Sequence, residues 1–345
     1  MVVITWDGLT QYAVRCLKEF IRSTSEKVVI LSTPNPYPAR NLEENLGCMP
    51  TWVEKDDMRS IEDVVGEWPR IYVAGGWSVP CFKRWLKESK VHGARTIFLP
   101  DEAWGVYPYW KDILKAVRYR LQRARWIDRV FCCGKGGRRL YRIFGVPDAH
   151  IYEGLYAGDP LVFHDGKPVS QRPKRFIYVG RYIPLKNLVN MGEAFVRVFD
   201  KHPDWTLELY GNGEMENRIP KHPAIHVHGY VQTDQLGDLY RDAQCFVLGS
   251  WKDNWGVVVH EAALCGCLLL LSKHVGAAQD MAVNGNSALF DPFSVAEFAT
   301  AMEKIMDMSD AEKDEGQKLS LQMAAKFSPK IFASRMNAMI DDLLA

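Results

Sequence analysis

The residues best suited to chemistry lie in one stretch of the second half of the chain, residues 249–263, which reads GSWKDNWGVVVHEAA. A loop is predicted to become a helix at Gly256, and the free N–H groups of a helix start attract phosphate oxygens. Asp253 can accept hydrogen bonds from sugar hydroxyls, and Glu261, inside the helix, can accept two from a ribose diol. A capping Asp followed by an ordinary helical Glu is the alternative. The residues predicted to contact a ligand here are Asp253, Asn254, Trp255, Gly256, Val257 and Glu261.

Two cations precede this stretch at the end of another predicted strand. Gly180 and Arg181 follow an apolar run, and Lys186 stands just before the next predicted helix. Two fixed positive charges suit a diphosphate leaving group, because they stabilise the negative charge that develops as a glycosyl bond breaks. Two surface bases in a loop are the alternative. The pair therefore supports a diphosphate site only in combination with the neighbouring motifs.

Glycine turns follow two further strand-like runs. Gly211 and Gly213 end one such run, and Gly229 and Tyr230 end the next. Glycine lets the backbone approach a ligand closely, and Gly229 could bring backbone groups near a nucleobase. A simple tight turn explains each motif at least as well when that motif is taken alone.

Apolar runs of strand length alternate with helix-like segments through both halves of the chain. These runs lie at residues 2–5, 28–31, 71–74, 96–99, 129–133, 176–179, 206–210, 225–228, 245–248 and 267–271. Runs that end in glycine or acidic loops are typical of parallel sheets covered on both faces. The sequence therefore predicts an α/β protein of two doubly wound, Rossmann-like domains, with ligands at the carboxyl ends of the strands. A polar segment rich in Gly and Pro, residues 158–173, is predicted to link the two domains.

The motifs of the second half occur in the order found in the donor domain of glycosyltransferase family four, and residues 174–335 resemble that domain. The family carries Gly-Arg…Lys after its first donor-domain strand, then a Gly-x-Gly turn. Two acidic residues with seven residues between them follow, around a Phe-Gly or Trp-Gly pair. The chain continues the match with EAALCG at 261–266, SKHVGAAQD at 272–280 and NGNSALF at 284–290.

The resemblance implies a GT-B fold, in which two Rossmann-like domains face each other across a cleft. The domains would span residues 1–160 and 174–328, and a last helix, 329–345, would pack back on the first domain. The implied activity is transfer of a sugar from a UDP- or GDP-sugar to a glycan or lipid-linked glycan, with retention of anomeric configuration.

The resemblance also implies roles for single residues. Arg181 and Lys186 would bind the donor diphosphate in place of a metal, Glu261 would hold the ribose, and no metal or cofactor is expected. The first acidic residue of the family's pair is Glu, whereas this chain has Asp253, which is one methylene shorter. The Asp253 carboxylate is therefore expected to reach less far toward the donor sugar than the family's Glu does.

The first half resembles the family only in layout. Gly8 stands where relatives place a glycine-rich loop that approaches the diphosphate. Relatives often carry a His after a later strand, and here Asp101 and Glu102 occupy that turn. These carboxylates could orient an acceptor hydroxyl or act as a base, or they could cap the next helix.

A base-rich segment runs from Lys111 to Arg142, with few acidic residues and with aromatic residues between the bases. It could be a surface that contacts an anionic membrane and finds a lipid-linked acceptor. It could also meet a phosphorylated glycan or a nucleic acid, although nucleic acid is not the expected partner. A solvated helix face whose bases extend over the core is the plain alternative.

Composition sets broad limits on the class of protein. The chain has 345 residues with a net charge of +1 and 47% hydrophobic residues, which suits two globular domains and indicates no particular partner. The eight cysteines show no zinc or redox spacing, so buried thiols in a reducing cytoplasm are expected. No apolar run is long enough to span a membrane, so a cytoplasmic protein, at most peripheral at the inner membrane surface, is expected.

The functional hypothesis is therefore a retaining glycosyltransferase. Two alternatives use the same fold: a nucleotide-sugar epimerase or hydrolase, and a non-catalytic protein that binds glycans or polyanions. The shortened Asp253 and the missing His favour the non-catalytic alternative, whereas intact Arg181, Lys186 and Glu261 argue against it.

Overall fold

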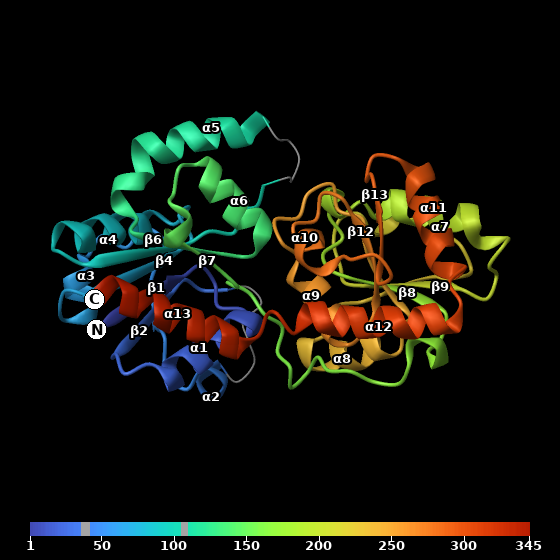
Figure 1. The fold of residues 1–345 in the computed structure, drawn as a ribbon, viewed down its shortest axis with the longest axis horizontal. Helices are drawn as coiled ribbons and strands as arrows, with labels where there is room; N and C mark the ends of the chain where they lie inside the picture. Colours follow the sequence, from blue (N-terminus) through green and yellow to red (C-terminus); the bar gives the residue numbers. More distant parts are fainter. Residues whose placement is uncertain (36–41, 105–109) are drawn as a thin grey trace. The chain divides into compact units, whose positions relative to one another are not determined.

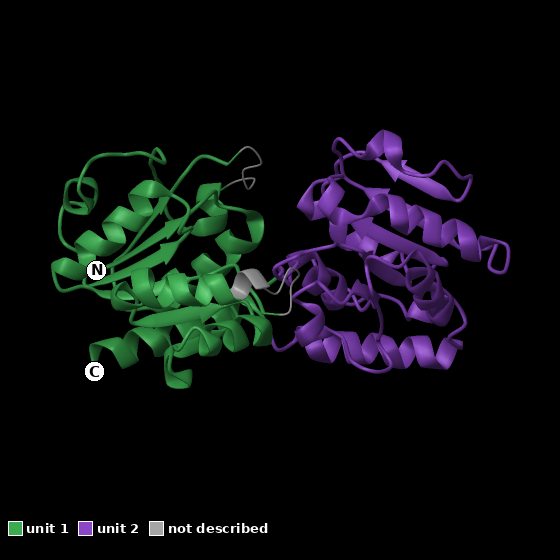
Figure 2. Ribbon diagram, turned by 90° about the horizontal axis from the view of Figure 1, so that it is seen from above, with its two compact units in different colours: residues 1–104, 108–157, 327–345 green, residues 105–107, 158–326 purple. Residues whose placement is uncertain are grey.

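The computed structural model describes residues 1–35, 42–104 and 110–345, and the chain forms two compact units (Figure 2). Unit 1 combines the described residues up to Ala157 with Phe327–Ala345, and unit 2 is the continuous segment Gly158–Lys326. Each unit contains one parallel sheet with helices on both faces (Figure 1). This architecture confirms the α/β fold of two doubly wound domains that the alternating apolar runs predict.

The sheet of unit 1 has seven strands in the order β3-β2-β1-β4-β5-β6-β7. The strands are β1 Val2–Trp6, β2 Val28–Ser32, β3 Thr51–Trp52, β4 Ile71–Gly75, β5 Arg95–Leu99, β6 Arg129–Cys132 and β7 Ile151–Glu153. The α-helices are α1 Gln11–Ser23, α2 Leu42–Leu46, α3 Ile61–Val65, α4 Pro80–Val91, α5 Trp110–Arg118, α6 Lys135–Ile143 and α13 Pro329–Leu344. Strands β1 and β4 are buried throughout, which explains their uninterrupted apolar sequences. The strand order reverses between β1 and β4, and ligands of such sheets bind at this point.

Helix α13 completes unit 1 beside α1 (Figure 1). The inner face of α1 buries Leu17 and Phe20, and that of α13 buries Phe332 and Ile340. The Phe332 ring packs 5.2 Å from the ring of Phe131 in β6, measured between centroids. Residues distant in sequence therefore share one hydrophobic core.

The sheet of unit 2 has six strands in the order β10-β9-β8-β11-β12-β13. The strands are β8 Arg175–Val179, β9 Thr206–Tyr210, β10 Ile225–His228, β11 Cys245–Leu248, β12 Leu268–Ser272 and β13 Ser287–Phe290. The α-helices are α7 Leu188–Phe199, α8 Thr233–Arg241, α9 Val257–Leu264, α10 Ala278–Met281, α11 Val295–Met306 and α12 Asp310–Ala324. The central strands β11 and β12 are buried throughout. Here the strand order reverses between β8 and β11.

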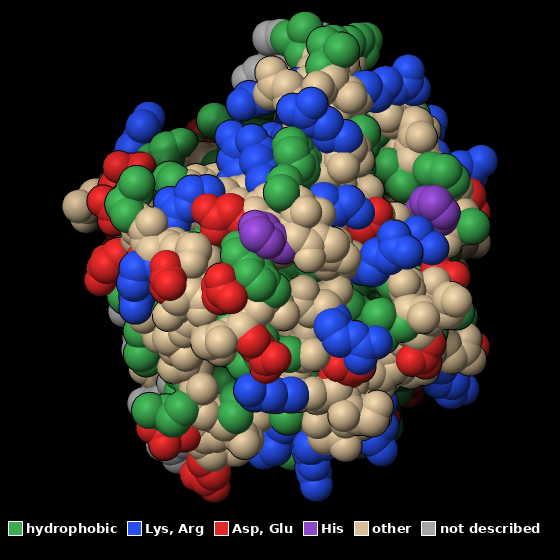
Figure 3. All heavy atoms as spheres, turned by 90° about the vertical axis from the view of Figure 1, so that its left-hand side faces the viewer, with side chains coloured by type: hydrophobic (Ala, Val, Ile, Leu, Met, Phe, Trp, Pro, Cys, Tyr) green, Lys and Arg blue, Asp and Glu red, His purple; other side chains and the backbone are tan. Residues whose placement is uncertain are grey.

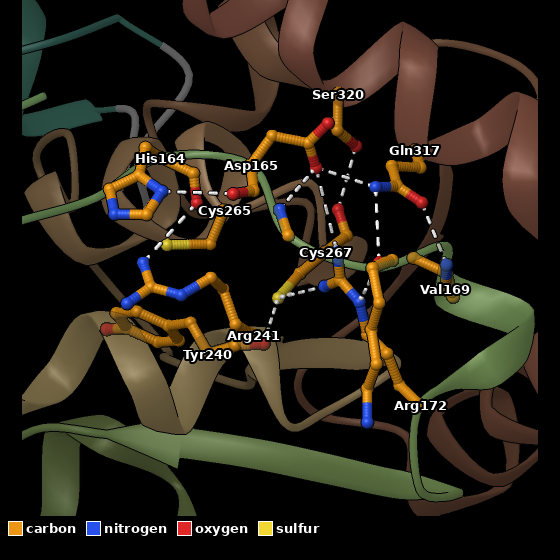
Figure 4. A network of polar contacts seen from close by, with 12 residues as sticks. His164, Asp165, Val169, Arg172, Tyr240, Arg241, Cys265, Cys267, Gln317 and Ser320 are labelled. Carbon is orange, nitrogen blue, oxygen red and sulfur yellow. Dashed lines mark hydrogen bonds and ion pairs between the residues drawn. The ribbon is translucent and has the colours of Figure 1, made fainter.

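Residues 158–173, which the sequence predicts to link the domains, are part of unit 2 and pack on it (Figure 4). Arg172 is 3% exposed, and its Nε donates a hydrogen bond to the carbonyl oxygen of Lys167 at 3.0 Å. Gln317 of α12 donates to Asp165 at 2.6 Å and accepts from the backbone N–H of Val169 at 2.8 Å. Residues 164–168 are exposed, whereas Asp159 and Arg172 are buried, so the polar composition of this segment reflects both solvent and hydrogen bonds within unit 2.

The base-rich segment contains several short elements rather than one helix. After α5 the chain makes a π-helical turn, Tyr119–Arg123, and a 3₁₀ turn, Ala124–Trp126, before entering β6. Tyr119 anchors the π turn in the core, 5.3 Å from the ring of Phe144. The side chain of Lys111, where the predicted segment begins, lies outside the described residues.

Candidate functional site

Two loops meet at the switch point of the sheet in unit 2, after β8 and after β11. The backbone N–H of Trp251 donates to the carbonyl oxygen of Leu185 at 2.9 Å. The Asn187 side chain donates to the carbonyl oxygen of Gly249 at 3.1 Å, and Asn187 holds a left-handed backbone with a φ of 60°. These bonds bring the cation-bearing loop and the Asp253 loop together at the carboxyl edge of the sheet.

Lys186 and Asp253 form an ion pair in this place. The Lys186 Nζ lies 2.6 Å from Asp253 Oδ2, and the two side chains are 17% and 14% exposed. The backbone of Asp253 is fixed by its N–H, which donates to His274, and by its carbonyl oxygen, which accepts from Gly276. Arg181, the other predicted cation, is exposed at the end of β8. The structure therefore joins two of the predicted catalytic residues directly.

The glycine turn after β9 packs against the loop that carries the cations. A Cβ on Gly211, whose φ is +147°, would lie 1.9 Å from the carbonyl oxygen of Gly180. A Cβ on Gly213, whose φ is +149°, would lie 2.4 Å from the carbonyl oxygen of Tyr182. Both positions require glycine because of close backbone packing as well as φ.

Helix α9 begins at the same edge, directly after Gly256, which caps it with a φ of +85°. Trp255, just before this cap, is 2% exposed, and its Nε1 lies 3.3 Å from Asp280 Oδ2. The Trp255 side chain therefore belongs to the core, where its indole N–H donates to Asp280 rather than facing an open ligand site. Asn254 and Val257 flank this helix start.

Glu261 lies on α9 with its carboxyl group almost fully buried. The residue is 7% exposed, and burial raises its pKa from 4.5 to about 8. A Cβ on Gly158 would lie 3.1 Å from the Glu261 Cγ, so the chain entering unit 2 passes against this side chain. A carboxyl group that is protonated near neutral pH can donate a hydrogen bond as well as accept one.

The turn after β10 presents an aromatic ring to solvent. Tyr230 is 51% exposed, and the carbonyl oxygen of Gly229 accepts a hydrogen bond from the N–H of Gly211 at 3.2 Å. The three predicted glycine turns of unit 2 are therefore adjacent along one sheet edge. An exposed ring there can stack on a flat heterocycle.

Unit 1 has a cavity of about 720 Å³ at its own switch point, at the carboxyl ends of β1, β4 and β5. Asp101 and Glu102, the carboxylates singled out in the first half of the sequence, line it, but Gly8 does not, although its neighbours Trp6 and Asp7 do. The Glu102 carboxylate lies 3.7 Å from the Lys115 Nζ. Gly8 has a φ of +70° and packs on Asn35, so the backbone of the turn after β1 explains why glycine stands there.

Sequence reasoning missed most of the side chains that surround this cavity. They include aromatic residues and cations from several elements of unit 1: Tyr12, Trp77, Lys83, Phe98, Arg118, Arg123 and Tyr156. The signal that could have found Trp77 was Gly75-Gly76-Trp77 at the end of a central strand, where a doubly wound sheet places its ligand. Arg118 and Arg123 belong to the predicted base-rich segment, but no local pattern indicated that they line this cavity with Lys83 of α4.

Neither a metal centre nor a membrane span is evident in the residues that the structure describes. No group of three or more His, Cys, Asp and Glu side chains there could hold a metal ion. Within the same residues, no helix is long and apolar enough to cross a membrane.

Comparison with solved structures places the chain in the GT-B fold class. HepE of Anabaena in complex with UDP and glucose matches with a TM-score of 0.73 at 12% identity, over 99% of this chain and 98% of that one. A glycosyltransferase of Rickettsia africae gives the same values. The lipopolysaccharide outer core galactosyltransferase WaaB matches with a TM-score of 0.69 at 11% identity, over 99% of this chain and all of that one.

The sequence comparisons each match part of the chain. Residues 163–320 match the family "Glycosyl transferases group 1". Glycogen synthase of Mycobacterium tuberculosis is 29% identical over 144 residues, which are 39% of this chain and 34% of that protein. Poly(glycerol-phosphate) alpha-glucosyltransferase of Bacillus subtilis is 24% identical over 179 residues, 49% of this chain and 25% of that protein. The matched region thus spans a quarter to a third of the length of these two relatives. The broad resemblance to GT-B glycosyltransferases is confirmed.

Proposed function

We propose that the protein is a glycosyltransferase that moves a sugar from a nucleoside-diphosphate sugar to a hydroxyl of a glycan or lipid-linked glycan, with retention of anomeric configuration. The observation that carries the proposal is the Lys186–Asp253 ion pair at the switch point of unit 2, beside the start of α9. It lies inside the segment that matches the glycosyltransferase family.

The donor site follows from the groups at this edge. The diphosphate would displace Asp253 from the Lys186 ammonium and would also bind Arg181, because phosphate oxygens bind cations strongly. Asp253 would then be released to accept hydrogen bonds from hydroxyls of the donor sugar. The N–H groups at the start of α9 add positive potential to the same place. These cations would stabilise the leaving diphosphate without a bound metal.

The nucleoside would lie along the same edge. Glu261 would hold the ribose diol, and Tyr230 would stack on the base, with the backbone of Gly229 alongside. A UDP- or GDP-sugar fits this arrangement. UDP and glucose occur together in the HepE structure that shares the fold, which supports UDP as the first candidate.

Asp101 and Glu102 of unit 1 are the candidates for orienting the acceptor hydroxyl or accepting its proton. Retention would follow a front-face transfer, in which the leaving diphosphate helps to remove that proton. This part of the proposal rests on the resemblance of the donor motifs, since no carboxylate of the described residues is placed as an evident nucleophile.

A calorimetric titration with UDP, GDP and their common sugar conjugates, with and without Mg²⁺, tests the donor site. Micromolar binding of one diphosphate without metal is expected, and Lys186→Ala and Glu261→Ala should each weaken it at least tenfold. Binding that requires Mg²⁺ would contradict the role given to the cations. Absence of binding to every compound would favour a non-catalytic polyanion-binding protein. Donor consumption without an acceptor would favour an epimerase or hydrolase.

We also propose a peripheral contact with an anionic membrane, at the cytoplasmic face, through α5 and the π turn. Four apolar side chains of this segment are exposed by 52% to 74%: Ile113, Leu114, Val117 and Leu121. Lys and Arg side chains gather over the same upper part of the molecule (Figure 3). An exposed apolar helix face flanked by bases is typical of helices that lie in the surface of an anionic bilayer.

Vesicle sedimentation tests this contact. The full chain should bind vesicles that contain phosphatidylglycerol more strongly than vesicles of phosphatidylcholine alone, and Leu121→Ser should weaken the binding. Val91→Ser is the matched control, since Val91 is also exposed, at 71%, but lies at the end of α4. Equal binding of both vesicle types, or no difference between the two variants, would refute the contact.

A further inference from the structure

The cavity of unit 1 combines aromatic walls with cations from three elements. Lys83 comes from α4, Arg118 from the end of α5 and Arg123 from the π turn. The Arg123 guanidinium carbon lies 4.6 Å from the centre of the Trp77 ring, and the Lys83 Nζ lies 5.9 Å from the same centre. Two positive charges therefore meet on one indole at the wall of the cavity.

The carboxylates of the cavity already have neighbours. Asp7 accepts a hydrogen bond from the Thr33 hydroxyl at 2.6 Å and lies 3.3 Å from the Lys55 Nζ. Glu102 lies 3.7 Å from the Lys115 Nζ, and Asp101 is 3.6 Å from the thiol sulfur of Cys133. These contacts fix the loops that carry the acids. The carboxylates therefore compensate the positive charges of the cavity cations only weakly.

The three cations lack a carboxylate at ion-pair distance within the described part of the chain. The Arg118 Nε donates to the side chain of Gln122 at 3.3 Å, and the Arg123 Nε is buried without a hydrogen-bond partner. Glu102 is the acid that acts on Arg123, through its longer-range field, and burial lowers the pKa of this guanidinium. A buried N–H without a partner costs about 1–3 kcal/mol. Arg123 also lines the cavity, where an anion would compensate the positive charge of its guanidinium.

A sugar fits the remaining walls. The rings of Tyr12 and Tyr156 lie 5.1 Å apart between centroids, and Trp6 packs 6.3 Å from Tyr156. Flat aromatic faces cover the apolar C–H faces of pyranose rings, while Asp101 offers an acceptor for a hydroxyl. A cavity of about 720 Å³ falls in the range of 300–1,000 Å³ that is usual for sites of small ligands.

We propose that the cavity of unit 1 binds an acidic sugar, and that Arg123, Lys83 and Arg118 hold its phosphate or carboxylate group. This inference rests on the proposed glycosyltransferase function in one respect: it makes the bound sugar the acceptor. Arginine and lysine placed on one side of an aromatic pocket select for the anion, because a neutral hydroxyl gains far less from them.

The test uses ligand titrations of the full chain, followed by nuclear magnetic resonance of the ligand. Methyl glucuronide carries a carboxylate, glucose 6-phosphate carries a phosphate, and methyl glucoside is the neutral control. At least one of the two anions is expected to bind about tenfold or more tightly than methyl glucoside, and the tighter one identifies the anionic group. Equal affinity for the neutral sugar and for both anions would overturn the proposal.

Two substitutions locate the binding. Arg123→Gln is expected to weaken binding of the preferred anion about tenfold, in line with the loss of hydrogen bonds to a charged group. Arg125→Gln is the matched control, because Arg125 also lies over an indole, 4.8 Å from the Trp126 ring centre, but does not line the cavity. An equal effect of the two substitutions would refute the assignment to this cavity.

The outcome is separable from that of the proposed function. A UDP titration of the unaltered protein and of Lys186→Ala reports on unit 2, because only binding at that site depends on Lys186. If UDP fails to bind while an acidic sugar binds and responds to Arg123→Gln, the donor assignment falls and the cavity assignment stands. If UDP binds and no anionic sugar is preferred, the donor assignment stands and the cavity assignment falls.

Discussion

Replacing Glu261 by Gln is expected to change how the stability of the protein depends on pH. Burial raises the pKa of this carboxyl group from 4.5 to about 8 in the folded protein. The folded state therefore keeps a proton that the unfolded chain has already lost between these two values. The stability that this residue contributes is fully present below pH 4.5 and falls as pH rises, until it levels off above pH 8.

The size of the effect follows from the two pKa values. One pKa unit corresponds to about 1.4 kcal/mol, so the native protein should lose about 2.5 kcal/mol of unfolding free energy between pH 5 and pH 7 relative to Glu261→Gln. It should lose about 1 kcal/mol more by pH 8. Gln keeps the size of the side chain but does not titrate, so the difference between the two proteins isolates the carboxyl group.

Urea unfolding at pH 5, 6, 7 and 8 measures this difference. The free energies of the native protein and the variant should diverge as the pH rises. Glu193→Gln, at an exposed position of α7, provides the control and should run parallel to the native protein. Parallel profiles for Glu261→Gln as well would show that the buried carboxyl group is already ionised at neutral pH, and the argument from burial would fail.

Three further substitutions, one of them with a matched control, probe the donor unit. Lys186→Ala should lower turnover about 100-fold or more, because the leaving diphosphate loses a fixed charge, while circular dichroism stays unchanged; near-normal turnover would exclude that role. Gly211→Ala should cost about 2–4 kcal/mol in urea unfolding, since its Cβ would meet the carbonyl oxygen of Gly180 at 1.9 Å. Gly229→Ala, where a Cβ meets nothing within 4 Å, should be nearly neutral, and equal losses would contradict the packing argument. Asn286→Ala removes three hydrogen bonds from a side chain that is 0% exposed and should lower the thermal midpoint by several degrees, with a loss of about 2–4 kcal/mol; an unchanged midpoint would show that water replaces those bonds.

The fold could be predicted from the sequence because its central strands are buried on both faces. Strands such as Leu268–Ser272 must be apolar at every position, so they appear as uninterrupted runs. The edge strand Thr51–Trp52 was not predicted, because it has two residues, both exposed. The same holds for Ile151–Glu153, whose short length carries no periodic signal.

The donor edge could be predicted in part because its residues follow strand ends in a fixed order. Adjacency of Lys186 and Asp253 is a consequence of sheet order, since β8 and β11 are neighbours although 67 residues separate the two side chains. The burial of Trp255 was not apparent, because its core partner Asp280 comes from α10. The roles of these residues in a reaction stay predictions.

The segment 158–173 shows why composition alone can mislead. Gly, Pro and polar residues predicted a linker, and residues 164–168 are exposed, yet Arg172 is buried beside the carbonyl oxygen of Ala243 and the thiol of Cys267. Those partners lie 71 and 95 residues further along the chain, where no local pattern connects them to Arg172. The prediction of buried thiols is confirmed, since seven of the eight Cys residues are buried. A free Cys in an apolar run packs in the core as a small hydrophobic residue.

The division of the chain has a consequence for the order in which the protein forms. Unit 2 is one continuous segment, so every contact of its core becomes available once Lys326 has been synthesised. Unit 1 needs Phe332 and Ile340 of α13, which are made only after all of unit 2. On the ribosome, the second unit in the sequence can therefore be the first to fold. The apolar face of α1 stays exposed until α13 has been synthesised. During that interval α1 is the surface on which a chaperone would act.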